Sequence, residues 1–261
     1  MRYDKQLKKQ QAIQEELQTL RAENESLKKE ASTMGEVLNS TLHEVRRFSA
    51  LVSKFAERLS RETEEQPQIN QTALSVLYTA GMISSRLAYT DIELNPRALE
   101  SQIPVRSGIY KKFDKAKRIL AEAARDKKIT VTLIGKSLTE IETLPVFELL
   151  PFVLIENGIK YSPPTQTVEI HFEQIHNRQV VRIKSIGPTV NSAELPNLFD
   201  KGFRAASTSN MPGDGLGLFL AKRVCEYHDI SISLHSGPKS SYQIGGIDYS
   251  EFEVTMRFPA P

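Results

Sequence analysis

Apolar residues recur at alternating spacings of three and four along the first 60 residues of the chain. With Ile13 at heptad position d, the d series reads Ile13, Leu20, Leu27, Met34, Thr41, Phe48 and Phe55. The a series reads Leu17, Asn24, Ala31, Leu38, Val45, Val52 and Leu59. A seam that outlasts roughly three to four heptads predicts a coiled coil, which we assign to residues 1–34. Leu at d with one Asn at a favours a parallel homodimer. The alternative is a single amphipathic helix on a globular core, although the pattern is longer than an ordinary helix.

This long helix is expected to end near residues 62–68, where charged residues accumulate before Pro67. A second helix is predicted over residues 70–89, and a linker with Pro96 and Pro104 follows over 93–105. Two helices joined by a short polar turn form a hairpin, and two hairpins make a four-helix bundle. Residues 35–95 are therefore predicted to be a helical-hairpin dimerisation domain.

The pattern changes after the linker to alternating helices and strands. Helices are predicted over residues 110–126, 145–160 and 216–228, and strands over 129–134, 168–173, 180–185, 230–235 and 251–258. This order indicates an α+β sandwich with its helices on one face of the sheet.

Composition excludes several classes of function. The 34 basic and 32 acidic residues leave a net charge of +2, which gives no electrostatic case for a nucleic-acid partner. Cys225 is the only cysteine, so neither an intrachain disulfide nor a cysteine-based metal site is expected. No stretch approaches the roughly 20 apolar residues that span a bilayer, and the charged start is not a secretory signal. We expect a cytoplasmic protein with no direct membrane span.

Three segments of the second half carry candidate chemistry: LIENGIKYSPP (154–164), SIGPTV (185–190) and GDGLGL (213–218). Gly213, Gly215 and Gly217 precede an apolar helix, and glycines before a helix N-terminus allow a phosphate to approach the backbone. A tight turn that merely starts a helix is the alternative. Asn157 and Lys160 share one helix face, where they could meet Mg²⁺ and a phosphate, and Tyr161 could stack on a base. Alternatively, they mark the polar end of a core helix.

The order of these segments resembles the N, G1, F and G2 boxes of the histidine kinases. ENGIKYSP matches the N box, LFDKGFR (198–204) the F box and GDGLGL the G2 box. The resemblance covers residues 106–261 and implies a Bergerat-type α/β sandwich that holds ATP and Mg²⁺ between its helices and a lid. It implies that Asn157 binds Mg²⁺, that Lys160 and the three glycines hold phosphates, and that Tyr161 and Ser185 face adenine. Gly187, Phe199 and Leu216 complete the implied nucleotide-binding set.

Two departures from the family pattern, and one residue that hydrolytic relatives carry and this chain lacks, affect this expectation. Ser185 stands where the family has an Asp that accepts from the adenine amino group, and losing a charged acceptor costs about 1–3 kcal/mol. Thr189 replaces the second glycine of the G1 box. Val153 stands where hydrolytic relatives carry a water-activating Glu, so transfer to a protein side chain fits better than hydrolysis.

His43 and Glu44 lie on the first helix, at heptad positions f and g. The resemblance implies that His43 accepts a phosphoryl group, with Glu44 taking the ring N–H proton. An exposed histidine without a role is the alternative. The family often has Thr or Asn four residues further on, where this chain has Arg47, so phosphatase activity of the familiar kind is not expected.

The sequence thus predicts an ATP-dependent, autophosphorylating histidine kinase of a two-component system, without its own sensor domain. It would pass phosphate to the receiver domain of a response regulator. One alternative is a dimeric nucleotide-binding scaffold of weak or no catalytic activity. Another is an ATP-hydrolysing machine of the gyrase or chaperone type, which Val153 disfavours.

Overall fold

The computed structural model describes residues 2–95, 97, 102–238 and 243–260, and it describes side chains from residue 13 onward. The chain falls into two compact units, Met1–Leu51 and Val52–Pro261. Among the helices described, none combines the length and the apolar composition needed to cross a membrane.

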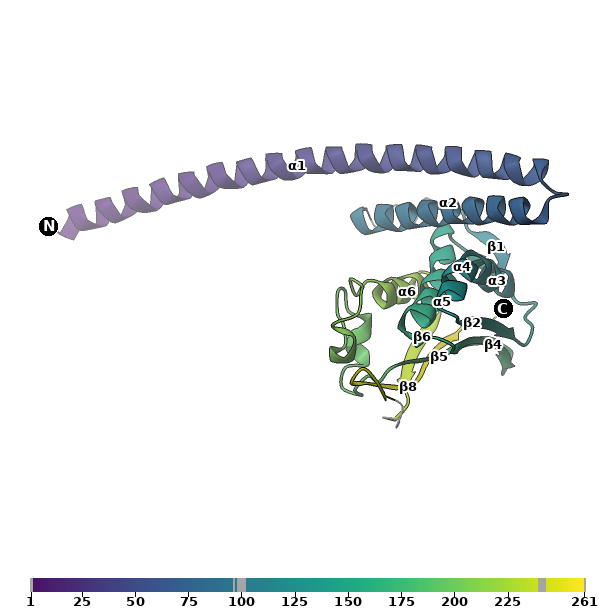
Figure 1. Cartoon of the computed structure of the whole chain (residues 1–261). Helices are drawn as coiled ribbons and strands as arrows, with labels where there is room; N and C mark the ends of the chain where they lie inside the picture. Colours follow the sequence, from purple (N-terminus) through teal and green to yellow (C-terminus); the bar gives the residue numbers. More distant parts are fainter. Residues whose placement is uncertain (1, 96, 98–101, 239–242, 261) are drawn as a thin grey trace. The chain divides into compact units, whose positions relative to one another are not determined.

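The first unit is the N-terminal part of one continuous helix, α1 (Arg2–Glu62), as the heptad pattern predicts (Figure 1). Its apolar seam faces solvent in the single chain. Ile13, Leu20, Leu27 and Met34 are between 47% and 65% exposed. A helix with so many exposed apolar side chains on one stripe has an unburied face.

The second unit begins with a helical hairpin made from the end of α1 and helix α2 (Pro67–Leu94). Pro67 occupies the first turn of α2, where its missing N–H costs nothing, so the helix starts earlier than the predicted residue 70. The Asn70 side chain donates to the Ser60 carbonyl at 2.6 Å and to the Ser60 hydroxyl at 3.1 Å, which fixes the turn. Ala56 and Ala73 are buried where the two helices meet.

A mixed sheet forms the centre of the second unit, in the strand order β2-β4-β5-β8-β6. The strands are β2 (Thr130–Ile134), β4 (Thr167–Ile175), β5 (Arg178–Pro188), β6 (Ser231–Ser236) and β8 (Ile247–Arg257). The pair β2–β4 is parallel and the other neighbours are antiparallel. The short strand β7 (Gln243–Ile244) pairs with β8, and a separate ladder joins β1 (Val105–Gly108) to β3 (Glu140–Thr143).

Helices cover one side of this sheet (Figure 1). They are α3 (Ile109–Ile119), α4 (Ala121–Asp126), α5 (Leu149–Tyr161) and α6 (Gly217–Glu226), with the 3₁₀ turns η2 (Pro145–Glu148), η3 (Pro196–Phe199) and η4 (Ala206–Thr208). The core between the layers includes the fully buried side chains Phe113, Leu150, Ile155 and Met256. The α+β class is confirmed.

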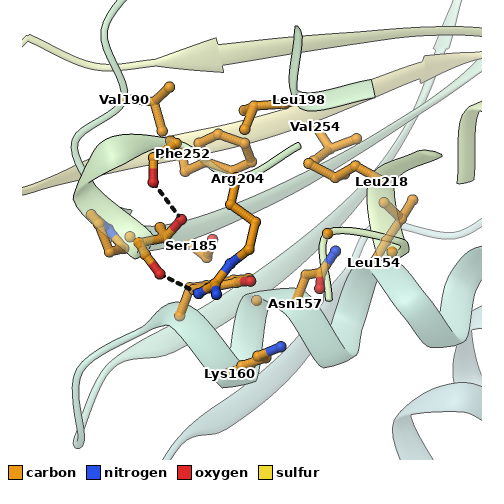
Figure 2. A pocket seen from close by; sticks show the side chains of 18 of the residues that line it. Leu154, Asn157, Lys160, Ser185, Val190, Leu198, Arg204, Leu218, Phe252 and Val254 are labelled. Carbon is orange, nitrogen blue, oxygen red and sulfur yellow. Dashed lines mark hydrogen bonds between the residues drawn. The ribbon is translucent and has the colours of Figure 1, made fainter. Parts of the chain in front are cut away.

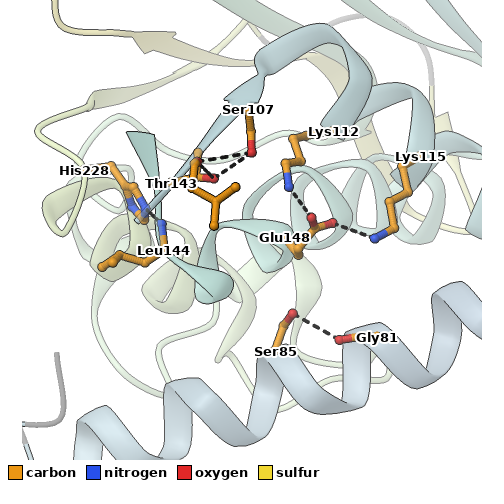
Figure 3. Close-up of polar contacts among 10 residues, drawn as sticks. Gly81, Ser85, Ser107, Lys112, Lys115, Thr143, Leu144, Glu148 and His228 are labelled. Atoms are coloured by element: carbon orange, nitrogen blue, oxygen red, sulfur yellow. Dashed lines mark hydrogen bonds and ion pairs between the residues drawn. The ribbon is translucent and has the colours of Figure 1, made fainter. Parts of the chain in front are cut away.

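Helix α5 carries the first candidate motif, and both of its ends have a local cause. Pro151 lies in its first turn, where no intrahelical N–H bond is lost. At the other end, Ser162 is extended because a residue before proline avoids the helical region. Glu148, at the junction with η2, accepts from Lys112 and pairs with Lys115 at 3.2 Å, so α5 is anchored to α3 (Figure 3).

Two predicted helices differ from the structure. The helix predicted over 110–126 is interrupted at Leu120, which has φ −88° and ψ 4°, so it forms α3 and α4. The helix predicted over 145–160 begins as the 3₁₀ turn η2 before α5.

Candidate nucleotide site

A pocket opens between α5, the sheet and the segment that leads into α6 (Figure 2). It encloses about 890 Å³, open solvent at its mouth included, which is within the range of small-molecule sites. Seven residues predicted from the sequence line it: Asn157, Lys160, Tyr161, Ser185, Gly187, Gly215 and Gly217. Segments that are distant in sequence therefore meet at one cavity.

The α5 wall presents polar side chains on one face because Asn157 and Lys160 are three residues apart. Asn157, Lys160 and Ser185 are drawn together in Figure 2, with the first two on the helix and Ser185 on the sheet. The Lys160 ammonium lies 5.1 Å from the centre of the Tyr161 ring. This wall offers an amide, a cation and an aromatic ring to a ligand.

The glycines of GDGLGL bring the backbone close to that wall. A Cβ on Gly213, which has φ +142°, would lie 2.4 Å from the Lys160 ammonium nitrogen. A Cβ on Gly217 would lie 3.1 Å from the Asn157 amide nitrogen. The N-terminus of α6, with its unpaired N–H groups, therefore lies directly beside Asn157 and Lys160, as an anion site requires.

The sheet wall is mainly apolar. Ile183, Ser185 and Gly187 alternate on β5 so that all three face the cavity. Phe252 and Val254 on β8 pair with Ser185 and Ile183 and line the same wall. Ser185 is 9% exposed. Its hydroxyl lies among the apolar side chains of this sheet wall, which forms the floor of the pocket.

Three predicted nucleotide-binding residues lie beside the cavity rather than among its lining residues. Gly213 contacts Lys160 as described above. The Phe199 ring lies 5.5 Å from the Lys222 ammonium. The Leu216 N–H donates to the Asp214 carboxylate at 3.1 Å, which shapes the turn before α6.

Arg204 is a lining residue that the sequence analysis did not single out. Its guanidinium donates to the carbonyls of Thr208 and Met211 and so holds the segment between η3 and α6 together. Within the structure as described, its buried Nε has no hydrogen-bond partner. Its position inside LFDKGFR was the available signal, but the motif alone does not indicate that the side chain turns into the pocket.

The position relevant to hydrolysis carries no acid. Val153 is 8% exposed, and its Cγ1 would lie 3.3 Å from a Cβ on Gly217. Burial raises the pKa of Glu156, an effect that Lys160 opposes and Asp214 reinforces. The Glu156 side chain is nevertheless exposed and outside the pocket lining. Among the described lining residues, Asp214 is the single acid.

His43 and Glu44 lie on α1 in the first unit, and both are exposed. In the single chain the a and d residues around them, such as Val45 and Phe48, are exposed as well. His171, His176 and His235 lie on or beside strands, and His228 is buried.

Comparison with known proteins identifies the class. Residues 150–260 match the family described as histidine kinase-, DNA gyrase B- and HSP90-like ATPases. This stretch is an ATPase domain of that class, and membership implies that the pocket binds ATP.

Individual sensor kinases are also similar to this chain. The chain is 32% identical to the sensor protein kinase PmrB of Pseudomonas aeruginosa over 125 residues, 47% of this chain and 26% of the relative. It is 19% identical to the sensor histidine kinase YkoH of Bacillus subtilis over 214 residues, 81% of this chain and 47% of the relative. The catalytic domain of the histidine kinase ThkA aligns with a TM-score of 0.49 at 14% identity, covering 60% of this chain and 96% of that one.

The match to the ATPase family and the likeness to these sensor kinases confirm the resemblance to the histidine kinases that the boxes carry. The chain spans about half or less of the length of these two curated relatives.

Proposed function

We propose that this protein is an ATP-dependent histidine kinase that phosphorylates itself on His43. The observation that carries the proposal is the meeting of Asn157, Lys160 and the α6 N-terminus around one cavity, in a domain of the ATPase family. In this proposal residues 1–34 form the coiled coil, 35–95 the dimerisation and phosphoacceptor domain, and 106–261 the ATP-binding domain.

The pocket residues are suited to holding the nucleotide for transfer. Lys160 and the backbone around Gly213, Gly215 and Gly217 would neutralise and orient the phosphates, and the apolar floor near Ser185 would take the base. The Asn157 carbonyl would hold Mg²⁺, which shields phosphate charge when it is bound. Gly217 supports this fit because its missing side chain leaves room next to Asn157.

The transfer needs a neutral imidazole. One ring nitrogen of His43 attacks the γ-phosphorus, the bond from that phosphorus to the β–γ bridging oxygen breaks, and ADP leaves. Glu44 would take the N–H proton of the other ring nitrogen, which keeps the attacking nitrogen nucleophilic. Val153 supports this reaction over hydrolysis, because it cannot activate water.

Two partners follow from the proposal. A second copy of the chain would cover the apolar seam of α1 and the groove lined by Val52, Phe55, Ala56, Leu59, Thr72, Ala73 and Val76. The receiver domain of a response regulator would accept the phosphoryl group from His43.

Labelling tests the proposal. The full chain, incubated with Mg²⁺ and γ-labelled ATP, is expected to gain an acid-labile, alkali-stable label that His43→Ala abolishes. His235→Ala, which removes another exposed histidine, is expected to keep the label. Nucleotide binding without label in the wild type would favour the scaffold alternative. Steady phosphate release without label would favour the hydrolytic one.

A further inference from the structure

The sheet end of the pocket is an apolar surface that carries one side-chain hydroxyl. Its walls are the apolar side chains of Ile183, Phe252 and Val254, and the Ser185 hydroxyl lies among them. Apolar walls suit the faces of a planar base, and a hydroxyl among them can hydrogen-bond to an edge of that base. With the base on this floor, as proposed above, Ser185 is the residue of this wall whose side chain can hydrogen-bond to the purine edge.

Among the lining residues that the structure describes, none at the sheet end of the pocket is acidic. Asp214, the single acid among the described lining residues, belongs to the turn before α6 and accepts from the Leu216 N–H. The segment between η3 and α6 adds two polar lining residues: Thr208, whose hydroxyl donates to the Ala205 carbonyl, and Arg204, whose guanidinium can only donate. Its Nε is buried and lacks an acceptor among the described residues.

The chemistry of these groups determines which base edge they tolerate. A carboxylate only accepts hydrogen bonds, so it pairs with a 6-amino group and repels a 6-oxo group. A serine hydroxyl either donates or accepts, because it rotates to suit its partner. A pocket that reads C6 with a hydroxyl has no group that rejects a 6-oxo purine.

We propose that Ser185 makes this pocket permissive at purine C6, so that 6-oxo purine nucleotides bind beside adenine nucleotides. The inference rests on the proposed nucleotide site and specifies its substrate class. Inosine diphosphate is the appropriate probe, because it differs from ADP at C6 without adding the 2-amino group of guanine.

Calorimetric titration of the full chain with ADP and with inosine diphosphate, in Mg²⁺, tests the proposal. The two dissociation constants of the wild type are expected to lie within about tenfold of each other. Ser185→Asp is expected to shift their ratio toward ADP by about tenfold or more. Ser185→Asn, which has the same shape but can both donate and accept, is expected to keep the wild-type ratio.

Each outcome decides between the alternatives. A wild-type preference for ADP above about a hundredfold overturns the inference, as do equal ratios in the Asp and Asn variants. Binding of ADP with no binding of inosine diphosphate overturns the inference alone, whereas binding of neither nucleotide also overturns the proposed function. Circular dichroism checks folding, and if Ser185→Asp does not fold, the ratios of the wild type and Ser185→Asn decide.

Discussion

The glycines of GDGLGL shape the nucleotide site because they lack a Cβ atom. Gly213 and Gly215 have φ values of +142° and +72°, which side chains disfavour. A Cβ on Gly215 would also lie 2.6 Å from the backbone of Gly202 and of Phe203, and the Gly202 N–H donates to the Gly215 carbonyl at 3.2 Å. Gly215 thus joins the F-box segment to the turn before α6.

Gly215→Ala is expected to weaken ADP binding by roughly tenfold or more, because it strains φ and displaces the backbone around the phosphate site. Gly81→Ala is the matched control, since nothing lies within 4 Å of a Cβ at that position in α2. We expect the control to keep its ADP affinity and to gain about 0.5–1 kcal/mol of stability. Calorimetry with ADP measures the first effect and urea unfolding the second. Equal ADP affinities in the two variants would contradict this account of the turn.

Residue type and spacing were enough to select several residues of the candidate site. Asn157, Lys160 and Ser185 could be selected from the sequence because each lies in a short motif, and the fold brings them to one cavity. Arg204 could not be selected, since its role depends on the direction of a long side chain and on two carbonyls further along the segment between η3 and α6.

Elements followed the sequence pattern where periodicity was strong and departed from it where tertiary contacts decide. The long α1 and the strands β4, β5 and β8 match their patterns. The ladder between β1 and β3 was not predicted, because each strand has only four residues and its pairing joins segments about 35 residues apart. The interruption at Leu120 has no glycine or proline to indicate it.

The buried His228 side chain connects two elements through tertiary hydrogen bonds. Its Nδ1–H donates to the Val224 carbonyl at 2.7 Å, and its Nε2 accepts from the Leu144 N–H at 3.0 Å, which joins the end of α6 to the start of η2 (Figure 3). The Phe147 ring packs edge-on against it. Both contacts fit the neutral imidazole, and burial lowers the pKa of His228 although the Val224 carbonyl opposes that shift.

The stability of the second unit should therefore depend on pH below 6.5, the ordinary histidine value. A histidine whose pKa is lowered by folding contributes stability above its unfolded pKa and loses it as pH falls toward the folded one. We expect a decline of at most about 1.4 kcal/mol per pH unit from this group. Urea unfolding at several pH values below and above 6.5 would measure it. His228→Phe is expected to be less stable at neutral pH and to show a flatter decline; parallel curves for the two proteins would exclude His228 as the cause.

At the scale of the whole molecule, the apolar seam of α1 is exposed in a single chain, where no described residue buries it. Leu20 and Leu27 are 56% and 59% exposed at d positions, and Asn24 lies between them at a. Burying such side chains contributes about 1.5–3 kcal/mol each, so pairing along the seam would bury a large apolar area. The polar Asn24 would favour its own partner across a parallel two-stranded seam and so oppose a shift in register.

Leu27→Glu is expected to weaken this pairing by about tenfold or more, because two carboxylates would face each other in the seam of a parallel dimer. Ser26→Glu adds the same charge one residue earlier, at heptad position c on the outer side of the helix, and is expected to leave the dimer unchanged. Light scattering coupled to size exclusion, over a dilution series, measures the dissociation constant for each protein. If both variants dimerise equally well, the seam is not the interface; if both dissociate equally, added negative charge and not the apolar seam controls assembly. Selective loss in Leu27→Glu would place the dimer contact on the stripe that the heptad defines.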